Sequence, residues 1–208
     1  MICARCEGWA DRPVVEPLGP SAAVALCPHC GHRERFDRFP LWFVAGSSAA
    51  GKTTIAPLLR PELPNCVVFE AEAVDYWRFR DEHGYAPLYD QWLKVAREIA
   101  LNGVPVVLLG IATPDQLDAS PLRPYFSTIA FLGLVCDEEV QAARLRARPA
   151  WRNAASPEFI RGACDFTRSL REQANQIATP MALVDTGAST LEETVAQVVT
   201  WVRQTLPR

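Results

Sequence analysis

The stretch LWFVAGSSAAGKTT, residues 41–54, decides the fold of this 208-residue chain. Its first five residues are apolar and predict a buried β-strand, and its last three are expected to begin a helix. Between them lies the pattern G-x-x-x-x-G-K-T, with four small residues between Gly46 and Gly51. Glycine lets the backbone turn so that successive N–H groups face one anion, and a helix N-terminus adds the positive end of its dipole. The stretch therefore predicts a phosphate-binding loop between a strand and a helix.

The residues of this loop are expected to have separate tasks. Small side chains at 47–50 leave the backbone open to phosphates, Lys52 is expected to reach the β- and γ-phosphates, and the Thr53 hydroxyl is expected to bind Mg²⁺. The predicted nucleotide-binding residues are Gly46, Ser47, Ser48, Ala49, Ala50, Gly51, Lys52, Thr53 and Thr54. The alternative is a turn of small residues that spells the motif by chance. The apolar run before the loop and the helical segment after it favour nucleotide binding.

On this motif the chain resembles the P-loop NTPase superfamily. Four further apolar runs predict buried strands, at 66–69, 104–109, 128–135 and 181–184, and segments of helical periodicity lie between them. Strands that are apolar throughout and alternate with helices indicate a parallel sheet covered on both faces. The expected fold of residues 39–208 is α/β, a P-loop kinase-like three-layer α/β/α arrangement with a five-stranded parallel sheet. The resemblance to the nucleoside monophosphate kinase group implies the strand order 2-3-1-4-5.

Acidic residues follow the second predicted strand, at Glu70, Glu72 and Asp75. A carboxylate at the carboxyl end of a strand beside the phosphate loop can reach an acceptor hydroxyl and the shell of Mg²⁺. The chain resembles small P-loop kinases of the gluconate, shikimate, chloramphenicol and polynucleotide type, in which an acid here accepts the proton of the attacking hydroxyl. This chain has Glu where those kinases have Asp. We expect Glu72 to be the base, followed by Asp75 and Glu70; the alternative is a solvated acidic loop.

Arginines follow the fourth predicted strand, in the segment RLRARPAWR at 144–152. The same resemblance implies a lid here, around 144–156, that closes over ATP and neutralises charge on the transferred phosphoryl group. We expect Arg148 and Arg152 to act in transfer, and Arg144 with Arg148 to bind the nucleotide. The alternative is a solvated basic helix end.

Two further positions bear on the class of P-loop protein. Relatives contact the adenine in the loop that follows strand five, here Asp185, Thr186 and Gly187, which makes Asp185 a candidate; the alternative is a polar helix N-terminus. Gly110 stands at the end of the third strand, where many NTPases carry a metal-binding acid, and this argues against a motor ATPase.

Two C-x-x-C pairs lie near the N-terminus, Cys3 with Cys6 and Cys27 with Cys30. Four thiolates in this spacing predict a tetrahedral Zn²⁺ site; the alternatives are a redox pair and unrelated buried thiols. Residues 1–38 are too few and too polar to fold on a core alone, so metal binding is expected to supply the missing folding energy. They are therefore predicted to be a zinc ribbon, of which the charged segment 33–38 is expected to be a solvated linker.

Composition limits the function. The chain is 49% hydrophobic and 22% charged with a formal net charge of −3. It therefore has no overall positive charge that would favour binding to nucleic acid or to a membrane. Its first residues do not resemble a signal peptide, no apolar run has the length of a membrane span, and a cytoplasmic protein is expected. The prediction is an ATP- and Mg²⁺-dependent kinase that phosphorylates a hydroxyl, or a phosphate, of a small metabolite, nucleoside or nucleotide. The alternatives are a nucleic-acid end kinase and an NTP-hydrolysing regulatory or scaffold module. The acceptor's identity and the oligomeric state stay open.

Overall fold

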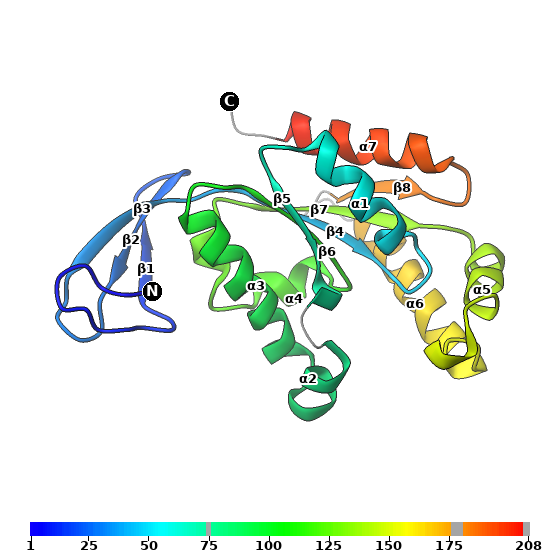
Figure 1. Ribbon diagram of the computed structural model, residues 1–208, viewed down its shortest axis with the longest axis horizontal. Helices are drawn as coiled ribbons and strands as arrows, with labels where there is room; N and C mark the ends of the chain where they lie inside the picture. The colour runs from blue at the N-terminus through cyan, green and yellow to red at the C-terminus, as the bar shows by residue number, and fades with distance from the viewer. Residues whose placement is uncertain (74–75, 176–180, 206–208) are drawn as a thin grey trace.

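The computed structural model describes residues 1–73, 76–175 and 181–205, except for the side chains of 73 and 76–79. A parallel sheet lies between two layers of helices, and a small antiparallel sheet adjoins it at one side (Figure 1). The helices α1 and α7 cover one face of the parallel sheet, while α3, α4 and α6 lie on the other.

The parallel sheet has the order β5-β6-β4-β7-β8, with β4 at its centre. Its strands are β4 (Leu41–Gly46), β5 (Val67–Glu70), β6 (Val106–Gly110), β7 (Ile129–Val135) and β8 (Met181–Asp185). Counted along the chain this is the order 2-3-1-4-5, which confirms the prediction. The central strand β4 is buried at all six positions, since helices cover it from both sides. The end of β4 therefore presents the phosphate loop at the carboxyl edge of the sheet.

The helices alternate with these strands. They are α1 (Lys52–Glu62), α2 (Tyr76–His83), α3 (Tyr85–Leu101), α4 (Pro114–Asp118), α5 (Glu138–Arg146), α6 (Pro157–Ala174) and α7 (Leu191–Gln204), with short 3₁₀ turns at Ala71–Ala73, Arg123–Tyr125 and Ala150–Arg152. Ile55 and Val198 belong to the core on the side of α1 and α7, and Leu88 and Trp92 to the core on the side of α3. Among the described residues, no helix is both long and apolar enough to cross a membrane.

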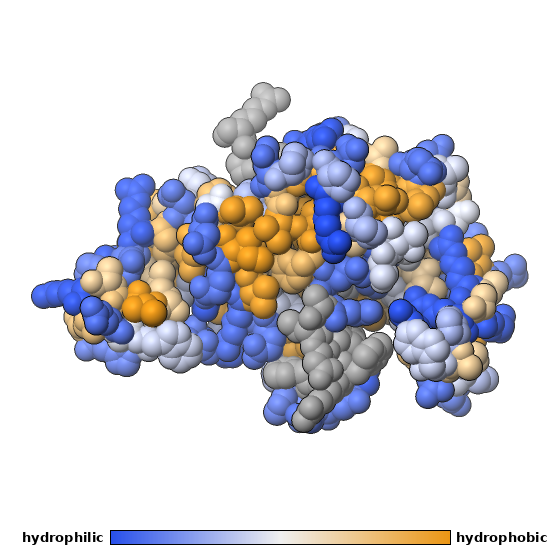
Figure 2. All heavy atoms as spheres, viewed as in Figure 1, coloured by the Kyte–Doolittle hydropathy of each residue, from blue (hydrophilic) through white to orange (hydrophobic). Residues whose placement is uncertain are grey.

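Some predicted boundaries and burials were wrong in detail. Pro61 and Pro64 predict the end of the helix after the phosphate loop, but Pro61 lies inside the last turn of α1. The spacing of apolar residues from Phe159 to Ile177 predicts one long helix, but α6 ends at Ala174, and Ile177 is outside the described residues. Helical periodicity predicts Val95 of α3 on the buried face, but it is 38% exposed, and Val67 of the edge strand β5 is 37% exposed. Figure 2, drawn in the view of Figure 1, shows apolar side chains over β5 and α3.

The N-terminal segment forms a three-stranded antiparallel sheet, β1 (Val14–Pro17), β2 (Ala22–Leu26) and β3 (Arg33–Asp37), in that order. The prediction of a solvated linker at 33–38 was wrong, because five of its six residues are β3. The charged side chains of Arg33 and Arg35 are exposed while Phe36 is half-buried and stacks on Tyr125 at 5.5 Å. This alternation is that of an edge strand with one polar face.

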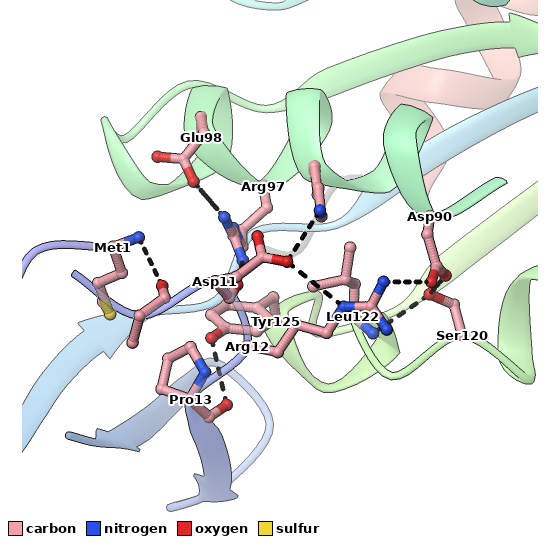
Figure 3. Close-up of polar contacts among 12 residues, drawn as sticks. Met1, Asp11, Arg12, Pro13, Asp90, Arg97, Glu98, Ser120, Leu122 and Tyr125 are labelled. Atoms are coloured by element: carbon pink, nitrogen blue, oxygen red, sulfur yellow. Dashed lines mark hydrogen bonds and ion pairs between the residues drawn. The ribbon is translucent and has the colours of Figure 1, made fainter. Parts of the chain in front are cut away.

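The ribbon is docked against α3 and the turn Arg123–Tyr125 by a polar network (Figure 3). Arg97 is 3% exposed, donates to the Asp11 carbonyl oxygen at 2.7 Å and lies over the Tyr125 ring at 5.1 Å. Lys94 pairs with the Asp11 carboxylate at 2.9 Å, and Arg12 pairs with Asp90 at 2.9 Å. A buried guanidinium with bonded partners fixes the ribbon in one position.

Candidate functional site

The phosphate loop joins β4 to α1, as the motif predicts. Gly51 immediately precedes α1 with φ 101°, a left-handed conformation that favours glycine. Gly46 packs closely, because an added Cβ would lie 3.1 Å from Ala50 Cβ and 3.3 Å from Leu134 Cβ. Ala49 also has a positive φ, 67°, which costs an ordinary residue roughly 1–2 kcal/mol. The surrounding contacts must hold the loop in this strained form.

Those contacts are side-chain hydrogen bonds to four consecutive carbonyl oxygens of the loop. Lys52 Nζ donates to the carbonyls of Gly46 at 2.7 Å and Ser47 at 3.0 Å. Gln141 Nε2 of α5 donates to Ser48 O at 2.9 Å, and Arg144 Nη1 donates to Ala49 O at 3.4 Å. Because the protein binds these acceptors itself, the loop and the start of α1 can offer N–H groups to an anion.

A cavity of about 400 Å³ opens over this loop, the size of a small-molecule site. Its walls are the phosphate loop, the first turn of α1, the acid after β5, one arginine of α5, a second arginine just beyond that helix, and the segment after β8. The lining residues are Ser47, Ala49, Gly51, Lys52, Thr53, Thr54, Ile55, Glu72, Arg144, Arg148, Thr186, Ser189, Leu191 and Thr194. We call this the loop cavity.

The loop cavity carries excess positive charge. Desolvation lowers the pKa of Lys52 to about 8; Glu72 and Glu70 raise it, while Arg148 lowers it. The pKa of Arg148 is also lowered, by burial and by neighbouring Arg152, against the opposing effect of Glu72. Cations whose pKa is lowered by burial and by a neighbouring cation are stabilised when an anion binds beside them.

A second cavity, of about 500 Å³, adjoins the first. Its lining residues are Ser48, Glu72, Arg148, Trp151, Arg152, Asn153 and Phe159. Glu72 and Arg148 line both cavities, so one carboxylate and one guanidinium stand where the two spaces meet. Trp151 is 77% exposed, and the Arg152 guanidinium lies over its ring at 4.9 Å. We call this the lid cavity, after the segment between α5 and α6.

Several solved protein structures share this fold. No protein-family model and no curated protein match the chain. The unliganded crystal structure of a sugar kinase from Janibacter sp. HTCC2649 matches it with a TM-score of 0.62 at 18% identity, over 80% of this chain and 96% of that one. A gluconokinase from Sinorhizobium meliloti 1021 matches with a TM-score of 0.55 at 20% identity, over 81% of this chain and 95% of that one. This chain has the fold of the small P-loop kinases.

A third structure of the same fold, the tunicamycin resistance protein of Deinococcus radiodurans, matches with a TM-score of 0.55 at 19% identity. It covers 82% of this chain and 99% of its own. About a fifth of this chain thus lies outside each match, and the N-terminal segment of 38 among 208 residues has that size.

The structure brings several predicted site residues together. Glu72 and Arg148 lie at the junction of the two cavities, and Arg152 lines the lid cavity. Glu70 ends β5 and lines a small recess with Lys52 and Glu72. Asp75 lies outside the described residues. Glu72 therefore stays the predicted base. Glu70, which lines the recess beside Lys52, is the alternative among the described residues.

Other predicted residues have different surroundings. Arg144 and Arg148 are four residues apart, which predicts that both lie on one face of a helix. However, α5 ends at Arg146, so Arg148 lies beyond the helix. Asp185 accepts from the N–H of Gly187 at 2.8 Å and from Arg171 at 3.1 Å; these bonds outweigh partial burial and lower its pKa. In the same segment it is Thr186 and Ser189 that line the loop cavity.

Sequence reasoning missed three contributors to the site. They are Gln141, which binds the phosphate loop, and Trp151 and Phe159, which line the lid cavity. A tryptophan among the lid arginines was the available signal for Trp151. Gln141 gave none, because one glutamine in a helix carries no motif.

The four predicted zinc ligands converge at the other end of the molecule. Their sulfur atoms all lie within 4.8 Å of one another, with Cys3–Cys30 at 3.8 Å and Cys6–Cys27 at 3.7 Å. Zn–S bonds of about 2.3 Å in a tetrahedron place sulfurs about 3.8 Å apart, so the cluster fits zinc. The sulfurs are too far apart for disulfides. In contrast, burial raises the pKa of the thiols of Cys66, Cys136 and Cys164.

Proposed function

We propose that this protein is an ATP-dependent phosphotransferase that phosphorylates a hydroxyl, or a phosphate, of a small metabolite, nucleoside or nucleotide. The observation that carries the proposal is that the loop cavity and the lid cavity meet at Glu72 and Arg148. A kinase needs two adjoining binding spaces with a base and a charge-stabilising group between them. The named structural neighbours, a sugar kinase and a gluconokinase, support the same class.

Each residue then has a definite task. The loop N–H groups and Lys52 would hold the phosphates, and Arg148 would stabilise negative charge that develops during transfer. Glu72 would accept the proton of the acceptor hydroxyl. The Thr53 hydroxyl and the strand-two acids are the residues suited to hold Mg²⁺, which supplies charge neutralisation between the phosphates when it is bound.

The lid cavity would hold the acceptor. Trp151 and Phe159 offer ring faces, while Arg152 and Asn153 offer hydrogen-bond donors. A hydroxylated molecule with a flat or apolar part fits this wall. The segment 147–156 would exclude water from the junction when it closes, which protects the phosphoryl group from hydrolysis.

We also propose that the four-cysteine cluster binds Zn²⁺ and that the ribbon is a structural module. The ribbon has five basic residues, Arg5, Arg12, Arg33, Arg35 and Arg38, and five acidic ones, Glu7, Asp11, Glu16, Glu34 and Asp37. It thus lacks the excess of basic charge that binding to a nucleic-acid backbone needs. This balance favours a small-molecule kinase over a nucleic-acid end kinase.

The test is transfer of label from γ-labelled ATP with Mg²⁺. Separate reactions contain sugars and sugar acids, shikimate, nucleosides and their monophosphates, aminocyclitol and nucleoside antibiotics, 5′-hydroxyl RNA or DNA, or no acceptor. A labelled small molecule, lost in Lys52→Ala, supports the proposal. A labelled oligonucleotide would favour the end kinase. Free phosphate at one rate with every acceptor would favour the regulatory NTPase.

A further inference from the structure

Gln141 is a fully buried polar residue in the middle of α5, with 0% of its surface exposed. Its Nε2 donates to Ser48 O of the phosphate loop at 2.9 Å and to Ala163 O of α6 at 3.3 Å. Its Oε1 accepts from the Thr167 hydroxyl at 2.9 Å. All of its hydrogen-bonding groups are therefore used, and its orientation is fixed by α6.

Gln141 and Arg144 lie three residues apart on α5 and bind consecutive carbonyls, those of Ser48 and Ala49. Ala49 is the loop residue with a left-handed backbone, φ 67°. A loop without these bonds would relax toward conformations that cost alanine less. Lys52 holds the two preceding carbonyls, but Lys52 is itself expected to bind phosphate. Gln141 is the loop's partner without such a second task.

We propose that Gln141 is a positioning residue that holds the phosphate loop in its anion-binding conformation. It acts through the Ser48 carbonyl and touches neither nucleotide nor acceptor. The proposal rests on nucleotide binding by the loop, which is one part of the proposed function. If the loop is held only part of the time, apparent nucleotide affinity falls by the same fraction.

The main test uses Gln141→Met and Mg·ADP as the probe. Met has nearly the same volume but no N–H donor, so packing is kept and the bond to Ser48 is lost. The Thr167 hydroxyl can then donate fully to Ala163 O, which already lies 3.2 Å away. We expect the Kd for Mg·ADP, measured by calorimetry, to rise about tenfold, with loop amides exchanging hydrogen faster.

The matched control is Thr167→Val, which removes the hydrogen bond to Gln141 Oε1 and leaves the bonds from Gln141 Nε2 to Ser48 O and Ala163 O. Its Kd should stay within about twofold of the wild type. Should Gln141→Met fold poorly, Gln141→Glu keeps the shape and the Thr167 bond but turns a carboxylate oxygen toward Ser48 O. It should weaken Mg·ADP binding at least as much.

The double variant Gln141→Met/Ala49→Gly distinguishes positioning of the phosphate loop from a general contribution of Gln141 to stability. Glycine adopts a positive φ without strain, so it should recover part of the lost affinity. Unchanged Mg·ADP binding in Gln141→Met, an equal loss in Thr167→Val, or no recovery in the double variant would each overturn the proposal. Failure of the wild type to bind Mg·ADP would overturn the proposed function and this inference together.

Discussion

Arg144 donates two hydrogen bonds to Thr186, from Nη2 to the carbonyl oxygen at 2.7 Å and from Nη1 to the hydroxyl at 2.9 Å. The Thr186 hydroxyl in turn lies 3.3 Å from Val135 O at the end of β7. Helix α5 is thereby tied to the segment after β8, and both residues line the loop cavity. A guanidinium engaged in this way shapes the wall of the cavity as well as charging it.

Arg144→Lys should therefore affect stability as well as nucleotide binding. An ammonium cannot reproduce the fork of bonds to Thr186 and Ala49, so we expect unfolding free energy to fall by roughly 1–3 kcal/mol. Urea denaturation measures this, and calorimetry should show weaker Mg·ADP binding. Arg146→Lys, at an exposed position of the same helix, is the control and should change neither quantity. Equal stability of the two variants would contradict the structural role.

The lowered pKa of Lys52 predicts that nucleotide binding depends on pH. Its pKa of about 8 in the free protein is well below the usual value, and a bound phosphate should raise it again because the phosphate favours the charged ammonium. Mg·ADP binding near pH 8.5 should therefore take up protons, and its Kd should rise as pH increases above about 8. Without nucleotide, the unfolded chain holds this proton to higher pH, so Lys52 makes stability increase with pH above about 8.

Calorimetry at pH 8.5 in two buffers of different ionisation enthalpy measures the proton uptake. Lys52→Arg is the control, since a guanidinium stays charged through this range and should take up no proton on binding. Equal proton uptake by the two proteins would show that another group titrates.

Much of the fold could be predicted because the strands are marked by uninterrupted apolar runs. The run 41–45 lies in the centre of the sheet, where every side chain is buried, and the phosphate-loop motif directly after it marks the start of α1. Strand β3 could not be predicted this way. Its sequence RERFD has only Phe36 to mark a buried face, and the partner ring, Tyr125, is far away in the chain.

The site divides in the same manner. Local chemistry marks the phosphate loop and the cysteine pairs, so their residues could be named from spacing alone. Gln141 binds Ser48, which lies 93 residues away in the sequence, and Thr186 binds Arg144, which lies 42 residues away. Such contacts are products of the tertiary fold. A single sequence does not record them.

Glu72→Gln tests the base. Glutamine keeps the shape but cannot accept the proton, so phosphoryl transfer should fall by about 10²- to 10⁴-fold while Mg·ADP still binds. Glu70→Gln is the comparison, because Glu70 lines the recess beside Lys52 without lining the lid cavity. The reverse ranking of the two variants would move the base to Glu70. Normal transfer by both would leave Asp75 as the acid to test.

The ribbon interface should contribute to stability. Arg97→Met removes the bond to the Asp11 carbonyl and the stacking on Tyr125, and it leaves a partly buried oxygen with one donor fewer. We expect a loss of roughly 2–3 kcal/mol in unfolding free energy. The control is Arg161→Met in α6, where the arginine is exposed and its ion pair is long, 3.9 Å. A similar effect of both substitutions would deny the interface its role.

Removal of zinc should separate the ribbon's role from that of the nucleotide site. The ribbon precedes β4, whereas the phosphate loop comes after it, so the two lie toward opposite edges of the sheet (Figure 1). A chelator, or Cys6→Ser, should remove one zinc per chain and lower the Tm by roughly 5 °C or more, because the metal supplies the ribbon's folding energy. Mg·ADP affinity below the unfolding transition should change less than about twofold, since the contacts of the loop come from α1 and α5. Cys66→Ser, outside the cluster, is the control and should keep the zinc. A parallel loss of zinc and nucleotide affinity would instead mean that α3, which the ribbon holds through Arg97, transmits the ribbon's state to the site.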